Sequence, residues 1–418
     1  MNRFDPKPRV RSKSFVRDHK PPGSSACEIQ NTCQSCRYIN QPYEASLQEK
    51  FQNGVSVLSS QIDMTGIRVL EPTPSSTTLG YRTHAKLAVR KPEHCLNPEP
   101  ESRFAIGIFR PNSHELVEIP QCPLHRHSIN QVVFDLKAEL NASSLTPYDE
   151  QSHTGDLRYI AIRASHITRE LMLTFVTLNE SPKSELLDIV LKLRRKGHSI
   201  TSSHMNINAD VTNVIFGKVS KRLAGADRLR ETICDLDFEI GPSSFFQVNP
   251  WQAEVIYRRI EHLAGNSQPD DVAWDLYCGT GQISLMLSRL GYRTLGVELN
   301  SQATRDATSN AIKNGTNNPP TFIVGRVEEN IDDFPSWSQN PKLIVVNPSR
   351  KGLDQKVSEL LRDFVAEKKI RLFYMSCEMD TLARDLAIIT GKGARVRQIE
   401  GYDMFPFTNK MEWLAVIS

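Results

Sequence analysis

The chain has 418 residues, of which 39% are hydrophobic and 24% charged, with a net charge of +3. This length predicts more than one domain, and this composition excludes collagen-like and wholly disordered chains. No segment approaches the roughly 18–20 apolar residues that a membrane helix needs, and the first residues match neither a secretory nor a mitochondrial signal. We therefore expect a cytoplasmic protein without a membrane partner.

Residues 1–25 are predicted to form a disordered basic tail. Only two acidic residues accompany its cations, which are Arg3, Lys7, Arg9, Arg11, Lys13, Arg17 and Lys20. Such an arm is able to contact nucleic-acid phosphates. A solvated tail that only keeps the chain in solution is the alternative, and the sequence leaves both open.

Three of the eight cysteines follow the tail closely, at Cys27, Cys33 and Cys36. Without a secretory signal, such spacing favours a metal or cluster site over disulfides. Cys122, followed by Pro123, is the expected fourth ligand, and Cys95 is its rival. Four thiolates bind either an iron–sulfur cluster or zinc, and spacing alone does not separate them. A set of cysteines without any ligand is the remaining alternative.

Residues 26–237 are predicted to form an α+β unit. The chain is expected to be irregular up to about Pro120, apart from strand-like runs at 85–89 and 104–109. Beyond it, apolar residues at helical spacing predict a helix over 127–140, with a strand pair at 159–163 and 171–176 and a helix over 185–195. This unit would carry the cysteine site.

From residue 238 to residue 418 strands and helices alternate, which predicts an α/β domain with a doubly wound parallel sheet of the Rossmann-like type. Ligands bind beyond the carboxyl ends of the strands in such sheets. We expect strands at 273–277, 293–298, 343–347, 371–376 and 412–417, and helices at 282–289, 302–314, 355–368 and 379–390.

A glycine loop follows the first of these strands, with Asp275, Gly279 and Gly281. Glycines at this place let the backbone approach a ligand, and Glu298, ending the next strand, is placed to bind ribose hydroxyls. A dinucleotide fingerprint needs a third glycine where this chain has Ser284. The loop therefore favours an adenosyl ligand without pyrophosphate, such as S-adenosylmethionine, over NAD; taken alone, a structural turn is the alternative.

Cys377 ends an apolar strand directly before a helix. A helix N-terminus lowers a thiol's pKa and favours the thiolate, so we expect a nucleophile. A buried cysteine acting as a small hydrophobic residue is the alternative. Glu412 opens the last strand and is a candidate general base, although strand-end carboxylates are usually just solvated. Cys278, inside the glycine loop, is expected to be structural.

Taken together, these motifs resemble the S-adenosylmethionine-dependent RNA uracil-5 methyltransferases. The resemblance spans the last 175 or so residues of the chain and rests on Ser243-Ser-Phe-Phe-Gln-Val-Asn-Pro250, Asp275-Leu-Tyr-Cys-Gly-Thr-Gly281, Asn347-Pro-Ser-Arg-Lys-Gly352, Ser376-Cys377, Thr381-Leu-Ala-Arg-Asp-Leu386 and the segment from Asp403 to Glu412. The four cysteines resemble that family's 4Fe–4S site. With no small RNA-binding barrel ahead of them, the chain is most similar to the short branch that methylates bacterial 23S ribosomal RNA.

The resemblance implies specific roles. Cys377 would add to carbon 6 of uracil, and Glu412 would remove the proton from carbon 5. Asn347 would also lie beside the uracil edge, and the uridine would be flipped out of an RNA loop. The implied cofactor-binding residues are Gln247, Tyr277, Gly279, Gly281, Glu298 and Asn347, and the implied cluster ligands are Cys27, Cys33, Cys36 and Cys122.

Four residues depart from the family pattern. Glu378 follows the cysteine where Asn is usual, and Ser349 replaces a proline. Phe407 and Lys410 stand where the family has histidines. The nucleophile, the last carboxylate and the glycine loop are intact, so the departures bear mainly on substrate identity. Glu378 would also raise the pKa of the neighbouring thiol and slow the reaction.

The sequence thus predicts a monomeric RNA uracil-5 methyltransferase with S-adenosylmethionine and a 4Fe–4S cluster, acting on 23S ribosomal RNA or, alternatively, on transfer RNA. One rival is a methyltransferase for exocyclic amino groups, since Asn347-Pro348 also opens such a loop. That chemistry needs no cysteine, and its stacking aromatic is missing at Ser349 and Arg350. A non-catalytic RNA-binding protein with a degraded site is the rival from another class.

Overall fold

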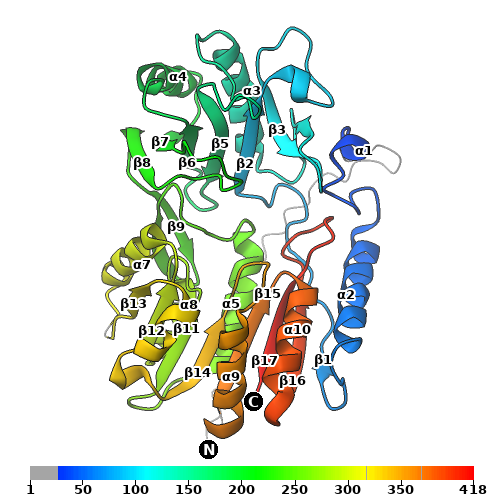
Figure 1. The fold of residues 1–418 in the computed structure, drawn as a ribbon, viewed down its shortest axis with the longest axis vertical. Helices are drawn as coiled ribbons and strands as arrows, with labels where there is room; N and C mark the ends of the chain where they lie inside the picture. Colours follow the sequence, from blue (N-terminus) through cyan, green and yellow to red (C-terminus); the bar gives the residue numbers. More distant parts are fainter. Residues whose placement is uncertain (1–26, 317, 369) are drawn as a thin grey trace, which may run out of the picture.

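The computed structural model describes residues 27–316, 318–368 and 370–418, which fold into two stacked units, each built on a large β-sheet (Figure 1). In this view the upper unit carries the cyan and green segments and the lower unit most of the yellow to red ones. The predicted basic tail, 1–25, lies outside the described residues. In the part of the chain described, no helix is both long and apolar enough to span a membrane.

The lower sheet is mixed, with eight strands in the order β1-β16-β17-β15-β14-β11-β12-β13. Strands β11 to β15 are parallel, but β17 is antiparallel to both its neighbours. The prediction of a wholly parallel sheet is therefore wrong for the last strand, which returns directly from β16 through a loop and so runs opposite to it. The strands are β1 (Arg68–Val69), β11 (Val272–Leu276), β12 (Arg293–Glu298), β13 (Thr321–Val324), β14 (Pro341–Val346), β15 (Arg371–Ser376), β16 (Val396–Tyr402) and β17 (Glu412–Ile417).

Both faces of this sheet are buried. Successive side chains of a strand point to opposite faces, so Trp274 and Tyr374 join one core, while Ala273 and Phe373 join the other. Burial on both sides explains why these strands are continuous apolar runs in the sequence. The helices of this unit are α2 (Tyr43–Ser59), α5 (Pro250–Ala264), α6 (Gln282–Arg289), α7 (Ser301–Asn314), α8 (Val327–Asn330), α9 (Gln355–Lys368) and α10 (Met379–Ile389).

The upper sheet has seven strands in the order β4-β3-β2-β5-β6-β7-β8. All its neighbouring pairs are antiparallel except β6 and β7, which a helix connects. The predicted strand pair and both predicted helices of this region are confirmed. The elements are α1 (Gln30–Cys33), β2 (His84–Arg90), β3 (Ala105–Phe109), β4 (Leu116–Glu118), α3 (His127–Asn141), β5 (Leu157–Ala164), β6 (Leu171–Thr177), α4 (Lys183–Arg195), β7 (Ile200–Ile207) and β8 (Val219–Gly225), followed by a hairpin of β9 (Leu229–Ile233) and β10 (Leu236–Ile240).

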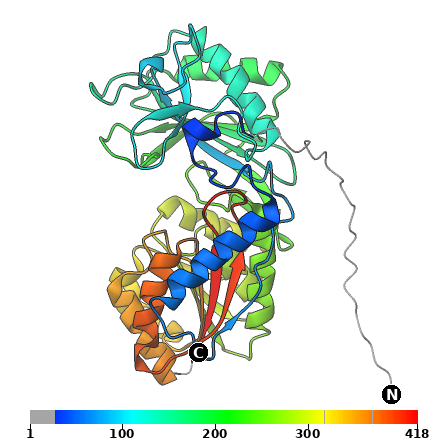
Figure 2. The ribbon, with the colours of Figure 1, turned by 90° about the vertical axis from the view of Figure 1, so that its right-hand side faces the viewer.

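Helix α2 and strand β1 come from the segment expected to be irregular, so that expectation is wrong for residues 43–59. Both belong to the lower unit. Strand β1 pairs with β16, and α2 lies across the sheet beside α10 (Figure 2). Phe51 stacks on Trp413 with ring centroids 5.5 Å apart. A Cβ atom on Gly54 would stand 2.1 Å from the Trp413 ring, so only glycine permits this close approach.

A buried lysine of α2 holds the loop between β16 and β17. The Lys50 ammonium donates to the Asp403 carboxylate at 2.5 Å, and to the backbone oxygens of Phe405 and Lys410 at 3.2 Å each. Burial lowers the pKa of Lys50, and the charge of Asp403 opposes that shift. Because this loop leads directly into Glu412, α2 takes part in fixing the position of a candidate catalytic residue.

Candidate active site

The carboxyl ends of the parallel strands lie at the edge of the lower sheet that faces the upper unit (Figure 1). The glycine loop follows β11, Glu298 ends β12, Asn347 follows β14 and Cys377 follows β15. The residues that the sequence analysis assigned to one edge are therefore neighbours in the fold.

The glycine loop bends sharply before α6. Tyr277, Gly279 and Gly281 have φ angles of 68°, 57° and 85°, in the left-handed region that costs least for glycine. The Gly279 N–H donates to one carboxylate oxygen of Glu298 at 3.0 Å, and the Asn300 N–H donates to the other at 2.7 Å. Through its hydrogen bond to Gly279, the Glu298 carboxylate thus holds the glycine loop in place.

A small pocket of about 30 Å³ lies in this loop. Of the predicted cofactor residues, Tyr277, Gly279 and Asn347 line it, whereas Gln247 does not line it but hydrogen-bonds the lining residue Tyr257. Gly281 instead caps α6. The remaining lining residues are Phe245, Tyr257, Asp275, Cys278, Gln282 and Ile283.

Asp275 supplies the one carboxyl group among the described residues that line this pocket. Ser284 donates to one of its carboxylate oxygens at 2.6 Å, but the other, also buried, has no partner within the described residues. Burial raises the pKa of Asp275 to about 7. A buried oxygen with spare accepting capacity fits a ligand that brings hydrogen-bond donors or a positive charge, as S-adenosylmethionine does.

Cys377 and Glu412 stand side by side because β15 and β17 are antiparallel neighbours. Ser376 pairs with Trp413, so the residue after Ser376 lies opposite the residue before Trp413. Glu412 is 3% exposed, and burial alone raises its pKa to about 8. The strand-end carboxylate is therefore buried, not solvated.

The thiol of Cys377 has a pKa raised to about 11, mainly by burial and next by the charge of Glu412. Arg350 faces the thiol and lowers its pKa through its charge and a hydrogen bond, while Glu378 raises it. This shift is opposite in direction to the lowering that we expected from the start of α10, because burial and the charges of Glu412 and Glu378 raise the pKa. The expected effect of Glu378 is confirmed in direction.

Three of the predicted cluster cysteines, Cys27, Cys36 and Cys122, pack beside Phe407 in the loop that leads to Glu412, and Cys33 packs with Cys122 in a second cluster. Burial raises the pKa of Cys36 to about 12, and the charges of Cys122, Cys33 and Cys27 add to this. Cys95, the rival ligand, packs in a different cluster of the upper unit. Among the residues described, no set of three or more His, Cys, Asp or Glu side chains is arranged to hold a metal ion.

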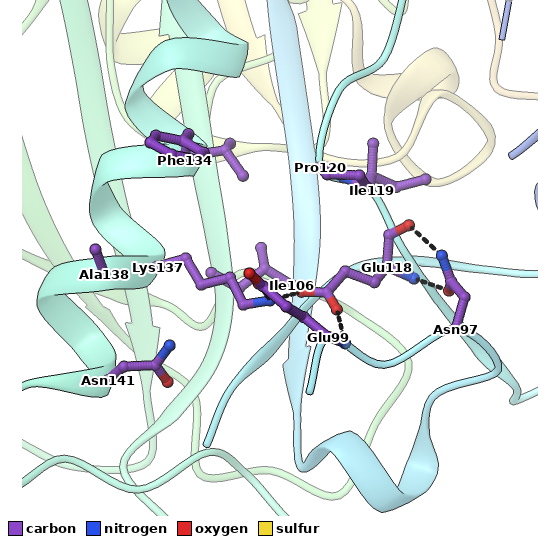
Figure 3. Close-up of a pocket in the computed structure, with 11 residues that line it drawn as sticks. Asn97, Glu99, Ile106, Glu118, Ile119, Pro120, Phe134, Lys137, Ala138 and Asn141 are labelled. Atoms are coloured by element: carbon purple, nitrogen blue, oxygen red, sulfur yellow. Dashed lines mark hydrogen bonds and ion pairs between the residues drawn. The ribbon is translucent and has the colours of Figure 1, made fainter. Parts of the chain in front are cut away.

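A larger cavity, of about 340 Å³, lies in the upper unit beside α3, away from these strand ends (Figure 3). Lys137 bridges the carboxylates of Glu99 and Glu118 there, and Asn97 bonds the backbone of Glu118. Its polar groups thus satisfy one another. The smaller pocket, with an unsatisfied carboxylate, is the better candidate for a binding site.

The sequence model of the tRNA (uracil-5-)-methyltransferase family matches residues 43–417. The chain belongs to this family. An uncharacterized RNA methyltransferase of Oceanobacillus iheyensis is 33% identical over 393 residues, covering 92% of this chain and 81% of the relative. One of Listeria monocytogenes is 34% identical over 397 residues, covering 94% and 83%. The protein is therefore an S-adenosylmethionine-dependent RNA (uracil-C5)-methyltransferase.

Among solved structures, the tRNA (uracil-54, C5)-methyltransferase of Pyrococcus abyssi, in complex with S-adenosyl-L-homocysteine, has the same fold. Its TM-score is 0.70 with 23% identity, and the match covers 93% of this chain and 86% of that one. The α/β fold with a Rossmann-like methyltransferase unit is thereby confirmed.

Sequence reasoning missed several residues around the site. Tyr257 lies near the charges of Glu412 and Asp275, yet its position in α5 gave only the signal of a core residue. Phe245 lines the pocket and is 57% exposed, and its place in the Ser243–Pro250 motif was the only signal in the sequence. The sequence analysis placed Arg350 in the Asn347–Gly352 motif but did not predict that it faces the Cys377 thiol.

Proposed function

We propose that this enzyme methylates carbon 5 of a uridine in RNA through a covalent bond between Cys377 and carbon 6 of the base. The observation that carries the proposal is the strand register that sets Cys377 opposite Glu412, with Arg350 facing the thiol. A nucleophile, a buried base and a cation together match what this chemistry requires. The same arrangement argues against a degraded, non-catalytic site.

Each residue has a defined step. The Cys377 thiolate bonds to carbon 6, and the electrons of the carbon 5–carbon 6 double bond move onto carbon 5 and its carbonyl as an enolate. S-adenosylmethionine supplies the electrophilic methyl group that carbon 5 then takes up. Glu412 accepts the carbon 5 proton, the double bond re-forms, and the carbon–sulfur bond breaks to return the thiolate. Arg350 stabilises the thiolate by charge.

The RNA proposed from the sequence is 23S ribosomal RNA, and transfer RNA is the second candidate. The family description and the Pyrococcus abyssi relative, a tRNA methyltransferase, favour the second. Both candidate RNAs are tested by methyl transfer from labelled S-adenosylmethionine to unmodified total RNA. The ribosomal and transfer RNA fractions are then separated and their nucleosides analysed. Label in 5-methyluridine supports the proposal and identifies the RNA. Label in another nucleoside, or none, contradicts it.

Tyr277, Gly279, Glu298 and Asn347, with Asp275, are proposed to bind S-adenosylmethionine. Glu298→Gln should weaken binding about ten- to hundredfold, since charged acceptors make hydrogen bonds worth about 1.5–3 kcal/mol. The variant also has only one accepting oxygen for the two N–H groups, of Gly279 and Asn300, that the Glu298 carboxylate binds. Isothermal titration calorimetry measures the change, with Glu180→Gln, a surface ion-pair residue, as control. Equal affinity in wild type and Glu298→Gln would remove Glu298 from the site.

We also propose that residues 238–418, together with α2 and β1, form the catalytic unit, and that the rest of 26–237 forms an RNA-binding unit with a 4Fe–4S cluster on Cys27, Cys33, Cys36 and Cys122. The mutual influence of these thiols and the nearby charge of Arg82 support an anionic four-thiolate site. A cluster is larger than one ion, so its ligands stand farther apart. Anaerobically purified protein should contain iron and inorganic sulfide, and Cys122→Ala should lose both. Zinc without sulfide would contradict the cluster.

A further inference from the structure

Two of the residues that depart from the family pattern are partners of one another. The Lys410 ammonium donates to the Glu378 carboxylate, and the two form an ion pair across a sequence separation of 32 residues. Their side chains are 28% and 23% exposed, so the pair is partly shielded from water. The acidic residue in place of asparagine and the basic residue in place of histidine thus compensate each other in charge.

Each partner adjoins one catalytic residue. Glu378 follows Cys377 directly, and Lys410 precedes Glu412 by two positions. The ion pair therefore links the two segments on which nucleophile and base are carried, in addition to the strand pairing of β15 with β17.

Hydrogen bonds from neighbouring side chains hold the backbone at both ends of the pair. The Ser376 hydroxyl donates to the Glu378 carbonyl at 3.0 Å and accepts from the Glu378 N–H at 3.1 Å, which closes a turn around Cys377. On the other side, the Lys410 carbonyl accepts from buried Lys50, and the Lys410 N–H donates to the Thr408 hydroxyl at 3.2 Å. Because the backbone at both ends is held in place, forming the ion pair costs less conformational entropy.

Three charged groups act on the Cys377 thiol: Glu412 from β17, Arg350 from the loop after β14, and Glu378 from the start of α10. Two of them are carboxylates, whose negative charge disfavours ionisation of the thiol. Lys410 neutralises one, Glu378, while Glu412 must remain for the proton transfer. Without Lys410, two uncompensated carboxylates would face a single arginine.

We propose that the Glu378–Lys410 ion pair is a positioning device for the nucleophile: it fixes the turn around Cys377 and cancels the carboxylate next to the thiol, so that the thiolate forms. This rests on the proposed covalent role of Cys377. Lys410 is a positioning residue that acts through Glu378, and Glu378 is tolerated beside the nucleophile because Lys410 is present.

The test is the rate of covalent adduct formation with 5-fluorouridine RNA and S-adenosylmethionine, measured against pH. Lys410→Met should move the rising limb of the profile to higher pH by about one unit, an about tenfold loss of rate at neutral pH. The double variant Glu378→Gln/Lys410→Met should return the limb toward that of wild type, because the opposing carboxylate is gone. Lys192→Met, which breaks a surface pair with Asp188, is the matched control and should leave the limb in place.

The inference is overturned by a rate lowered equally at every pH in Lys410→Met, by a double variant no better than the single one, or by a loss confined to RNA affinity. Unchanged affinity for S-adenosylmethionine shows that each variant is folded. If wild type itself forms no adduct, the proposed function fails with the inference. If wild type forms it and the limbs coincide, only the inference fails.

Discussion

Cys377→Ala should abolish methyl transfer to RNA, with a loss of at least about a thousandfold. Carbon 5 of uracil is a poor nucleophile until a thiolate has added to carbon 6, and no other cysteine lies opposite Glu412 in the described fold. Transfer of labelled methyl into 5-methyluridine measures the effect. Cys95→Ala, which removes a partly buried thiol from the upper unit, is the matched control and should retain activity.

The variant must also be shown to be folded and loaded. Because Cys377 does not line the glycine-loop pocket, Cys377→Ala should bind S-adenosylmethionine as wild type does. Methyl transfer by this variant at a rate near that of wild type would contradict the covalent mechanism.

Glu412→Gln should form the adduct but fail to release it, lowering turnover by about a hundred- to ten-thousandfold, the scale of one general base. A carboxamide fills the same buried space at the start of β17 and cannot accept the carbon 5 proton. The methylated base then stays attached to Cys377. Denaturing gels with labelled natural RNA should show a protein–RNA band in Glu412→Gln that wild type does not accumulate.

The same variant has a predicted pH signature. Only the ionised carboxylate accepts a proton, so release by wild type should rise with pH through about 8, the raised pKa of Glu412. Glu412 is also the largest charge that raises the pKa of Cys377. Its removal should let the adduct form at lower pH than in wild type. An adduct that Glu412→Gln releases as fast as wild type would show that another group is the base.

The helices and strands of the catalytic unit could be predicted from the sequence. Its strands are buried on both faces and so form continuous apolar runs, and the helices between them follow regularly. Strands β12, β15 and β17 and helices α6 and α9 begin and end at the predicted residues. Their regular alternation also placed the candidate site, since parallel strands end at one common edge. Local patterns therefore gave the position of most of the site.

Long-range pairings account for what the sequence did not reveal. Helix α2 contains Gly54 and many polar residues, and the glycine is explained only by the Trp413 ring on which it packs. The reversal of β17 depends on which strand it joins. The raised pKa of Cys377 comes from burial and from the charge of Glu412. Lys410 compensates the charge of Glu378 through a contact between segments that are distant in the sequence.

The most direct test of covalent catalysis is mass-spectrometric mapping of the product that wild type forms with 5-fluorouridine RNA and S-adenosylmethionine. Fluorine at carbon 5 cannot leave as a proton does, so the enzyme should stop with the base attached. The account predicts a methylated 5-fluorouridine nucleotide on the peptide that contains Cys377. Attachment at another residue, or no attachment by an enzyme that makes 5-methyluridine in natural RNA, would contradict it.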